Sequence, residues 1–196
     1  MDNNIIDLIF PHDGVFEIIL GTTGVRPNLA PIGIIREKSV LKSKIYKSTL
    51  TYQNLQVNRK CSINVTLDPL LFYYCFIGKC NWETYDDIPV LSNSLSIIAE
   101  CDYEKLDSDP IIITYRIKNI IRNSSNMKAY SRGDALFIDF LVHLSRIDIY
   151  SDAEIKQFLP IIEYELKTIS RLSPNLKDIV QRIADYLNSK GLKVSV

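Results

Sequence analysis

Residues 28–33, NLAPIG, combine residue types that a β-strand normally avoids, inside a segment that otherwise has the apolar character of a strand. Pro31 has no backbone N–H, so it requires a sheet edge, a bulge or a place where the ladder is open. Ala30 and Gly33 remove side-chain bulk, and the amide of Asn28 offers both donors and acceptors. These features suit a strand whose backbone closely approaches a planar heteroaromatic ring such as a flavin. The alternative, which this segment alone favours, is a bulged edge strand that binds nothing.

A second stretch, residues 47–51 (KSTLT), places three hydroxyl groups and one ammonium group at the expected start of a helix. A helix N-terminus exposes unpaired N–H groups and carries a positive partial charge, so it stabilises an anion. Ser48, Thr49 and Thr51 would add donors to phosphate oxygens. The alternative is ordinary helix capping by Thr49 or Thr51. Because the stretch follows the small-residue strand, with further lysines between them, the order suggests a ring site and then a phosphate site. The lysines also suit a solvated strand edge that discourages aggregation.

Other polar residues have roles that the sequence leaves open. Asn64 lies inside an apolar strand, where its amide needs a partner, and Asn54 lies in an expected helix. Either residue can contact a cofactor or serve the local structure. Asp139, His143 and Arg146 share one face of an apolar helix, since residues three or four apart are neighbours. For this set we favour polar groups that satisfy one another at a helix interface, over a contact with a substrate or with a cofactor of a neighbouring subunit.

Several classes of function lack support in the sequence. The chain has 23 Lys and Arg against 23 Asp and Glu, and this zero net charge argues against a general nucleic-acid binder. There is no P-loop and no GxGxxG motif, which argues against ATP and the dinucleotides of Rossmann folds. No candidate nucleophile accompanies His143, so hydrolase chemistry has little support. The long apolar run at residues 67–77 is interrupted by Asp68 and Pro69, so no membrane span is expected.

The cysteine pattern and the first residues predict a cytoplasmic protein. The N-terminal residues have no basic start before an apolar segment, so they do not form a signal peptide. The cysteines form no CxxC pair, and only two histidines accompany them, which argues against a zinc site. In the cytoplasm, cysteines are expected as buried or half-buried thiols and not as disulfides. The four cysteines are Cys61, Cys75, Cys80 and Cys101.

The apolar pattern of the first two thirds of the chain predicts β structure. Residues 51–59 fit a short helix, and Asp68 and Pro69 start a helical turn as N-cap and first helical residue. Residues 78–93 are polar and rich in turn formers, so a surface loop is expected. The expected strands are residues 15–20, 29–35, 43–47, 61–67, 95–103 and 110–121.

After residue 131 the apolar period becomes helical. A first helix carries apolar residues from Leu136 to Ile147. A capping box of Ser151 and Glu154 opens a second helix, which ends near residue 172 and is expected to kink at Pro160. A last helix runs from residue 174 to Gly191. The predicted fold class is therefore α+β, with a β-rich body of residues 1–130 and a helical C-terminal extension of residues 131–196 packed on it.

The order of four segments, VFEIILGTTG, NLAPIGI, KSTLTYQNL and SINVTLDPLLF, resembles the FMN-binding split β-barrel proteins. These are relatives of flavin reductases, flavoredoxin and the pyridoxamine-phosphate-oxidase-like barrels. Within them the chain is most similar to a mainly archaeal group of uncharacterised members, domain of unknown function 447. That group shows a turn like Ser131-Arg132-Gly133, followed by a helix that ends like Ser145-Arg146. The resemblance covers residues 13 to 150.

The resemblance implies a split β-barrel, a homodimer, and FMN bound between the subunits. The isoalloxazine ring would lie against the small-residue strand, and the phosphate would lie near the hydroxyls at the helix start. Asn64 would match a polar position on the strand that follows. Arg36 and Arg132 are candidates for the positive charge that meets the phosphate. The implied contact residues are Asn28, Leu29, Ala30, Pro31, Ile32, Gly33, Ser48, Thr49, Thr51 and Asn64.

The sequence thus predicts an FMN-dependent oxidoreductase of the flavin-reductase type, with NAD(P)H or another reduced compound as electron donor. The flavin would carry the electron chemistry, so no acid–base residue is required of the protein. Two alternatives stay open. One is a module that binds FMN without turnover, and the other is a dimeric interaction protein that has lost its ligand.

Overall fold

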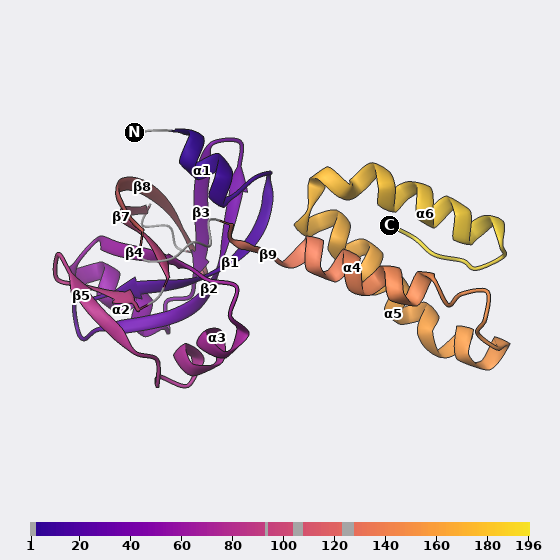
Figure 1. The fold of residues 1–196 in the computed structure, drawn as a ribbon, viewed down its shortest axis with the longest axis horizontal. Coiled ribbons are helices and arrows are strands. Elements are labelled where there is room, and N and C mark those ends of the chain that lie inside the picture. Colours follow the sequence, from indigo (N-terminus) through magenta and orange to yellow (C-terminus); the bar gives the residue numbers. More distant parts are fainter. Residues whose placement is uncertain (1–2, 93, 104–107, 123–127) are drawn as a thin grey trace. The chain divides into compact units, whose positions relative to one another are not determined.

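Six strands of the N-terminal part close into a barrel (Figure 1). A computed structural model describes residues 3–92, 94–103, 108–122 and 128–196. The strands neighbour one another in the order β2-β3-β8-β7-β4-β1, and β1 also pairs with β2, which completes the closure. A short strand β9 lies next to β1. The bounds are β1 Gly14–Thr22, β2 Asn28–Glu37, β3 Val40–Ile45, β4 Lys60–Val65, β7 Leu95–Tyr103, β8 Ile111–Arg122 and β9 Tyr130–Ser131.

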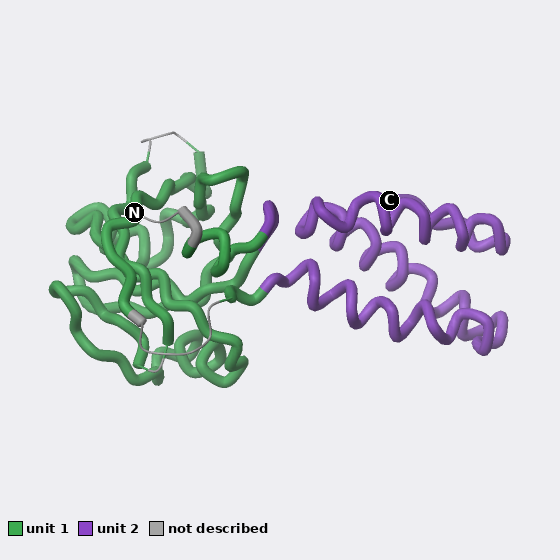
Figure 2. The backbone as a smooth tube through the Cα atoms, turned by 45° about the horizontal axis from the view of Figure 1, so that its top comes forward, with its two compact units in different colours: residues 1–11, 16–130 green, residues 12–15, 131–196 purple. Residues whose placement is uncertain are grey.

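The chain forms two compact units, shown in separate colours in Figure 2. The first, here called the barrel unit, comprises residues 1–11 and 16–130. The second, the helical unit, comprises residues 12–15 and 131–196. The predicted combination of a split β-barrel with C-terminal helices is confirmed. None of the described helices has the length and apolar composition needed to span a membrane.

Alternation along β1 shows how the barrel is filled. Phe16, Ile18 and Leu20 point to one side and are fully buried in the main core with residues of the other strands. Ile19 points to the opposite side, yet it is also fully buried. It packs there in a second apolar cluster with Leu29 and with residues of α3 and β6. The strand is therefore covered on both faces, which explains its nearly continuous apolar sequence.

The barrel unit also contains three helices and a β-hairpin among its described residues. The helix α1 at the N-terminus was not predicted, and it is attached to β2 because Arg36 bonds both Asp7 and the carbonyl of Phe10. The predicted helices after residues 50 and 68 are confirmed, while the third strand begins earlier than expected, at Val40. The bounds are α1 Asn3–Ile9, α2 Leu50–Val57, α3 Pro69–Phe76, β5 Trp82–Tyr85 and β6 Ile88–Leu91.

The expectation of a surface loop over residues 78–93 was wrong. This segment contains the hairpin β5–β6, and every residue of β6 is buried. Side chains of the barrel hold it there: Ser62 Oγ donates a hydrogen bond to the Pro89 carbonyl over 2.6 Å, and the Leu91 N–H donates to Asn64 Oδ1 over 2.9 Å. The polar composition belongs to β5 and to the turns, and it concealed a short buried strand.

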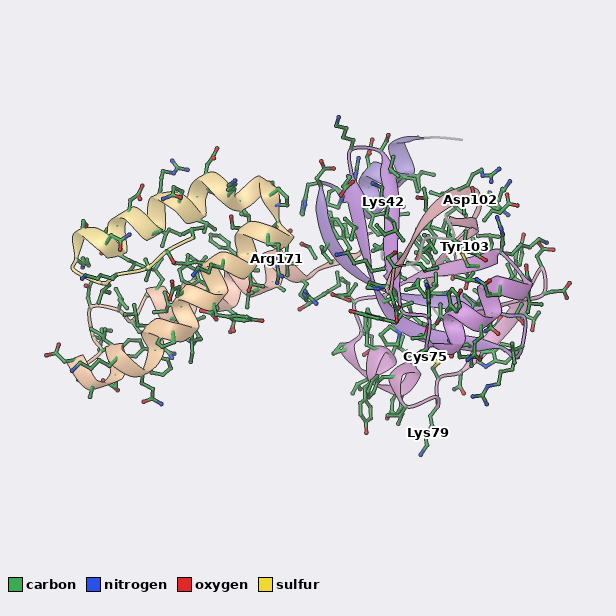
Figure 3. All side chains as sticks on the ribbon, turned by 180° about the vertical axis from the view of Figure 1, so that it is seen from behind. Lys42, Cys75, Lys79, Asp102, Tyr103 and Arg171 are labelled. Carbon is green, nitrogen blue, oxygen red and sulfur yellow. A yellow bond between two sulfur atoms is a disulfide. The ribbon has the colours of Figure 1, made fainter. Side chains whose placement is uncertain are left out.

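The expectation of reduced thiols was also wrong for this structure. Cys61 pairs with Cys101 as a disulfide that joins β4 and β7, and Cys75 pairs with Cys80 at the end of α3. Cys75, labelled in Figure 3, packs in the same cluster as Leu29. The spacing of the cysteines did not reveal either pair, because both form through tertiary contacts or through the turn after α3.

The helical unit contains three long helices with an apolar core between them. Ser151 and Glu154 form the predicted capping box at the start of α5. This helix continues through Pro160, and the predicted kink there stays a prediction. Phe140, Leu166 and Val180 come from the three helices and are fully buried together. The bounds are α4 Arg132–Leu144, α5 Asp152–Leu172, the short 3-10 helix Pro174–Leu176 and α6 Lys177–Ser189.

The polar set predicted on α4 has a different partner. The His143 Nδ1 lies 3.0 Å from Glu165 Oε2 on α5, whereas Asp139 and Arg146 are exposed. Glu165 is buried, so the imidazole supplies the polar contact that its carboxylate needs. The structural role that we favoured fits this helix interface, but the predicted Asp–His–Arg combination was wrong.

Candidate functional site

A groove of about 510 Å³ on the barrel unit joins the two stretches singled out in the sequence. Its wall on one side is the start of β2, and its other walls are the end of β3 and the start of α2. The volume lies within the range of ordinary cofactor pockets. The lining residues are Asn28, Ala30, Pro31, Ile32, Gly33, Lys44, Ile45, Tyr46, Thr49, Leu50 and Thr51.

The unusual composition of β2 falls on the part of the strand that borders the groove. The pairing of β2 with β3 runs from Ile34↔Ser43 to Glu37↔Val40, so residues 28–33 extend beyond this ladder. A proline without an N–H is tolerated where the partner strand does not require one. Pro31 therefore removes no hydrogen bond from the ladder between β2 and β3.

A buried hydrogen-bonded chain supports the groove at Gly33. The Ser43 hydroxyl donates to the Gly33 carbonyl over 2.9 Å, and it accepts a hydrogen bond from the Tyr115 hydroxyl over 2.8 Å. Burial raises the pKa of Tyr115, and the hydrogen bond with Ser43 partly offsets that rise. Tyr115 is thus held in its neutral, donating form, and the chain fixes the direction of one carbonyl on the groove wall.

The start of α2 shows how its threonines are used. Thr49 is the N-cap: its Oγ1 accepts from the Tyr52 N–H over 3.2 Å and donates to the Tyr46 carbonyl over 2.7 Å. The capping interpretation of Thr49 is therefore correct, although the residue also lines the groove. Thr51 is almost fully buried, and its Oγ1 accepts from Asn28 Nδ2 over 3.1 Å. The first N–H groups of α2, those of Leu50 and Thr51, have no acceptor within the helix, so this end of the groove attracts an anion.

Asn54 organises the loop that leads into β2. Its Oδ1 accepts hydrogen bonds from the N–H groups of Val25 and Arg26, at 2.9 and 3.2 Å. Its Nδ2 donates to the Arg26 carbonyl at 2.8 Å and to Thr22 Oγ1 at 3.1 Å. Gly24 must be glycine here, since a Cβ would lie 2.6 Å from the Asn54 carbonyl oxygen. Asn54 thereby positions the residues that precede Asn28, and it belongs to the helix whose first residues line the groove.

Three of the residues predicted from the sequence do not line the groove. Leu29 is buried behind it, in the cluster that contains Cys75. Ser48 is exposed at the turn before α2. Asn64 is fully buried on β4, where its Nδ2 donates to the Ile19 carbonyl over 2.9 Å and its Oδ1 accepts from Leu91 and Ser96.

Other lining residues were not predicted. Lys44 and Ile45 end β3, Tyr46 follows that strand, and Leu50 is the first residue of α2. The sequence could have indicated them, because they lie between or within the two predicted stretches and the chain there includes a strand expected to pair with β2. Arg36, a candidate for the phosphate charge, is instead engaged with Asp7 and α1. Arg132, the other candidate, belongs to the helical unit and does not line the groove.

The groove is equipped to bind and orient a ligand. Among its described lining residues there is no carboxylate, histidine or cysteine, and Lys44 carries the only charge. Its lining combines apolar side chains such as those of Ile45 and Leu50 with the amide of Asn28 and the hydroxyls of Thr49 and Thr51. These residues can bind a ligand and orient it.

Comparison with known proteins identifies the chain's relatives. Residues 16–124 match the family described as "Protein of unknown function (DUF447) N-terminal domain", and residues 131–187 match "Protein of unknown function (DUF447)". An FMN-bound protein of this family from Methanosarcina mazei has a similar structure, with a TM-score of 0.52 and 21% identity. That similarity covers 79% of this chain and 86% of the other.

Two further structures resemble the barrel more distantly. A putative flavin reductase from Haemophilus somnus has a TM-score of 0.47 and 15% identity, over 56% of this chain and 81% of the other. A flavoredoxin from Methanosarcina acetivorans has a TM-score of 0.47 and 15% identity, over 55% of this chain and 68% of the other. The family match spans both units and more than half of the residues, so the chain belongs to the DUF447 family.

Proposed function

We propose that this protein binds FMN in the groove of the barrel unit and acts as a flavin-dependent oxidoreductase of the flavin-reductase type. One observation carries the proposal: the groove unites the small-residue start of β2 with the N-terminus of α2. A planar ring and an anionic group at its end need these two surfaces together. The relative from Methanosarcina mazei is an FMN-bound protein, which supports the same choice of ligand.

The lining residues fit the parts of FMN. In this proposal the ring lies against residues 30–33, where Ala30 and Gly33 leave room beside the backbone. The phosphate lies at the start of α2, close to Thr49 and the N–H groups of Leu50 and Thr51. Lys44, which lines the groove, supplies the positive charge, and Ser48 adds a donor from the turn. Leu29 and Asn64 act behind the wall, by packing and by fixing β6.

The lining residues indicate which tasks belong to FMN and which to the protein. When bound, FMN supplies the ability to accept and release electrons, including a hydride from NAD(P)H. The residues of the groove bind the ligand, orient its ring and limit the access of water. The described lining contains no carboxylate, histidine or cysteine, which agrees with chemistry that belongs to the cofactor.

A spectrum of the purified full-length chain tests the proposal. The protein should carry the visible absorbance of oxidised flavin, or acquire it with one equivalent of added FMN after removal of excess ligand. Anaerobic NADH or NADPH should then bleach the band. A protein that retains no FMN under these conditions contradicts the assignment. Riboflavin, which has the ring without the phosphate, should bind more weakly if the start of α2 holds the anion.

A second candidate is a flavin-binding module without turnover. A described lining without a carboxylate, histidine or cysteine is equally compatible with it. The two candidates differ in the same experiment, because a module of this kind retains FMN but is not reduced by NADH, NADPH or reduced ferredoxin. Retention without bleaching by any of these donors would favour the module over the oxidoreductase.

The assembly and location belong to the same proposal. We expect a homodimer with the flavin between the subunits, formed by a flavin-binding body of residues 1–130 and its helical extension of residues 131–196. Tyr46, which lines the groove and is 57% exposed, is an apolar group that a second subunit would cover. Sedimentation equilibrium with and without FMN tests this arrangement. A cytoplasmic location is also proposed. Disulfides are rare in the cytoplasm, so measuring whether the cysteines of the two pairs are reduced or oxidised inside the cell tests this location directly.

A further inference from the structure

The solvent-facing side of α3 is apolar along its whole length. Residues 69–78, PLLFYYCFIG, contain no charged side chain. The inward side of the helix packs, through Cys75, in the buried cluster that contains Leu29. The outward residues follow the spacing i, i+3, i+4, i+7, which on most helices marks the side that faces a core. This outward side, here called the α3 face, consists of Leu70, Tyr73, Tyr74 and Ile77.

The α3 face exposes an unusually large apolar area. Leu70 and Tyr73 are 59% and 56% exposed, and Phe76, one turn from Tyr73, is 78% exposed. A fully covered aromatic side chain buries roughly 150–250 Å², so the exposed parts of Tyr73, Tyr74 and Phe76 amount to roughly 300–400 Å². That is about half of the ~800 Å² that each partner buries in a standard interface. Apolar patches of this size on a protein surface mark interaction sites.

Charges of opposite sign flank the α3 face in the sequence. Asp68 is the N-cap of the helix, and its Oδ1 accepts a hydrogen bond from the Leu70 N–H over 2.8 Å. Lys79 follows the helix, and its N–H donates to the Tyr74 carbonyl over 2.8 Å, which keeps residue 79 next to the last turn. Lys79 is exposed, and Figure 3 shows its side chain extending away from the barrel. One end of the α3 face is therefore acidic and the other basic.

This arrangement complements itself. In a two-fold symmetric contact, residue i of one copy lies opposite residue j of the other, and j lies opposite i. Asp68 precedes Tyr73 by five residues, and Lys79 follows Tyr74 by five. An antiparallel pair of α3 helices with its axis between the two tyrosines therefore brings Asp68 of one copy opposite Lys79 of the other. These charges attract each other, and so do the dipoles of two antiparallel helices.

We propose that the α3 face binds the α3 face of a second copy of this chain, as an antiparallel helix pair with two-fold symmetry. In this pair the apolar side chains cover one another, and an Asp68–Lys79 ion pair lies at each rim. A membrane surface fits less well, because helices that lie on membranes are rich in basic residues, whereas one acid and one base flank α3. The α3 face shares no residue with the flavin groove, so this contact goes beyond the proposed function.

Sedimentation equilibrium of the full chain tests the contact. The unaltered chain should be an oligomer with an even number of copies. Tyr73→Glu should have half of that mass, because two like charges then face each other beside the axis. Tyr164→Glu is the matched control, since Tyr164 is 64% exposed on α5, and it should keep the mass of the unaltered chain.

The possible results separate the alternatives. A monomeric unaltered chain overturns the proposal. An equal mass in Tyr73→Glu also overturns it, and would assign the α3 face to another part of the same chain or to a different partner. The same loss of mass in Tyr164→Glu contradicts the location. The measurement needs no flavin, so a chain that binds no FMN but halves its mass in Tyr73→Glu would contradict only the flavin proposal.

A charge reversal tests the antiparallel arrangement. Lys79→Glu places two like charges at each rim, so self-association should weaken about tenfold at low salt, and less at high salt. Adding Asp68→Asn removes this repulsion while asparagine still caps α3, so association should partly recover. Lys156→Glu, at an exposed position of α5, should have no effect. Failure of Asp68→Asn to restore association would exclude the antiparallel pair. Because residue 79 lies in an exposed turn, this series decides even if Tyr73→Glu does not fold.

Discussion

The side-chain amide of Asn28 donates a hydrogen bond to Thr51 Oγ1 over 3.1 Å, and this bond joins the two parts of the groove. Asn28 is the first residue of β2, and Thr51 lies in the first turn of α2. The strand that faces the proposed ring and the helix that faces the proposed phosphate are therefore held together directly. The Asn28 amide serves as a structural donor in this structure.

Thr51→Val tests that link. Valine keeps the shape of threonine and removes the acceptor of Asn28, so the relative position of β2 and α2 should loosen. We expect FMN to bind about tenfold more weakly, which corresponds to about 1.4 kcal/mol. Isothermal titration with FMN measures the effect. Thr84→Val, on the exposed strand β5, is the control and should bind FMN normally. Unchanged affinity in Thr51→Val would separate this bond from ligand binding.

Ser43→Ala should destabilise the barrel more than Tyr115→Phe does. The Ser43 hydroxyl bonds two buried groups, so its loss leaves both the Tyr115 hydroxyl and the Gly33 carbonyl without that partner. Each such group costs about 1–3 kcal/mol. Urea unfolding of both single variants and of the double variant measures this. The double variant should lose less than the sum of the singles, because the two hydroxyls interact. An additive result would show that the chain is not coupled.

Tyr115 also predicts how stability depends on alkaline pH. Its folded pKa is raised above the ordinary value of 10.0, because burial disfavours the phenolate. The unfolded chain therefore releases this proton first, and the stabilising contribution, complete below about pH 10, is lost as the pH rises further. The loss from this group is about 1.4 kcal/mol per pH unit. Urea unfolding between pH 9 and 11 on the full chain and on Tyr115→Phe tests the sign, with a shallower decline expected in the variant.

Asn54→Ala should release the loop of residues 23–27. Asn54 holds two N–H groups and a carbonyl of that loop, and all these bonds are lost together in the variant. The expected loss of stability is about 3 kcal/mol, as for the removal of a buried amide with several partners. Hydrogen exchange should increase at Val25 and Arg26. Gln53→Ala, an exposed neighbour on α2, should change neither. Normal exchange at the loop in Asn54→Ala would contradict its positioning role.

The Cys61–Cys101 disulfide should stabilise the oxidised barrel. The bridge closes a loop of 40 residues, and the loss of chain entropy in the unfolded state predicts about 4 kcal/mol. Thiol titration of the unfolded, non-reduced protein should find no free cysteine, and urea unfolding should occur earlier after reduction. Cys75→Ser with Cys80→Ser removes only the short bridge and should have a smaller effect, because its loop closes only five residues. Four free thiols in freshly isolated protein would show that neither bridge forms in the cell.

Part of the candidate site could be predicted because its signals are local. The proline and glycine in residues 28–33 conflict with an uninterrupted strand, and the hydroxyls of residues 47–51 match a helix start. The effect of proline and glycine on a strand and the preference for hydroxyl residues at a helix start both act within a few residues, so a single sequence reveals them. The groove that joins them depended on the barrel, since Lys44 and Ile45 line it from β3.

The predictions that the structure did not support involve distant partners. For Asn64 the sequence left a cofactor contact and a local role open, and the residue lies buried with bonds to Ile19 and Leu91 and does not line the groove. His143 was expected to pair on its own helix, and it pairs with Glu165 on α5. The sequence shows that a buried amide or imidazole needs a hydrogen-bond partner. Which residue becomes that partner depends on which strands and helices pack together.

From the sequence alone follow the strand-rich body, the helical extension, the capped helix starts and the two stretches that form the groove. These features depend on periodicity, backbone conformation and capping, which act between residues close in the chain. The tertiary structure alone decided that the barrel closes by β1 pairing with β2, that residues 88–91 are buried, and that Cys61 pairs with Cys101. Such contacts join residues far apart in the sequence, and their energy depends on the packing of the whole barrel.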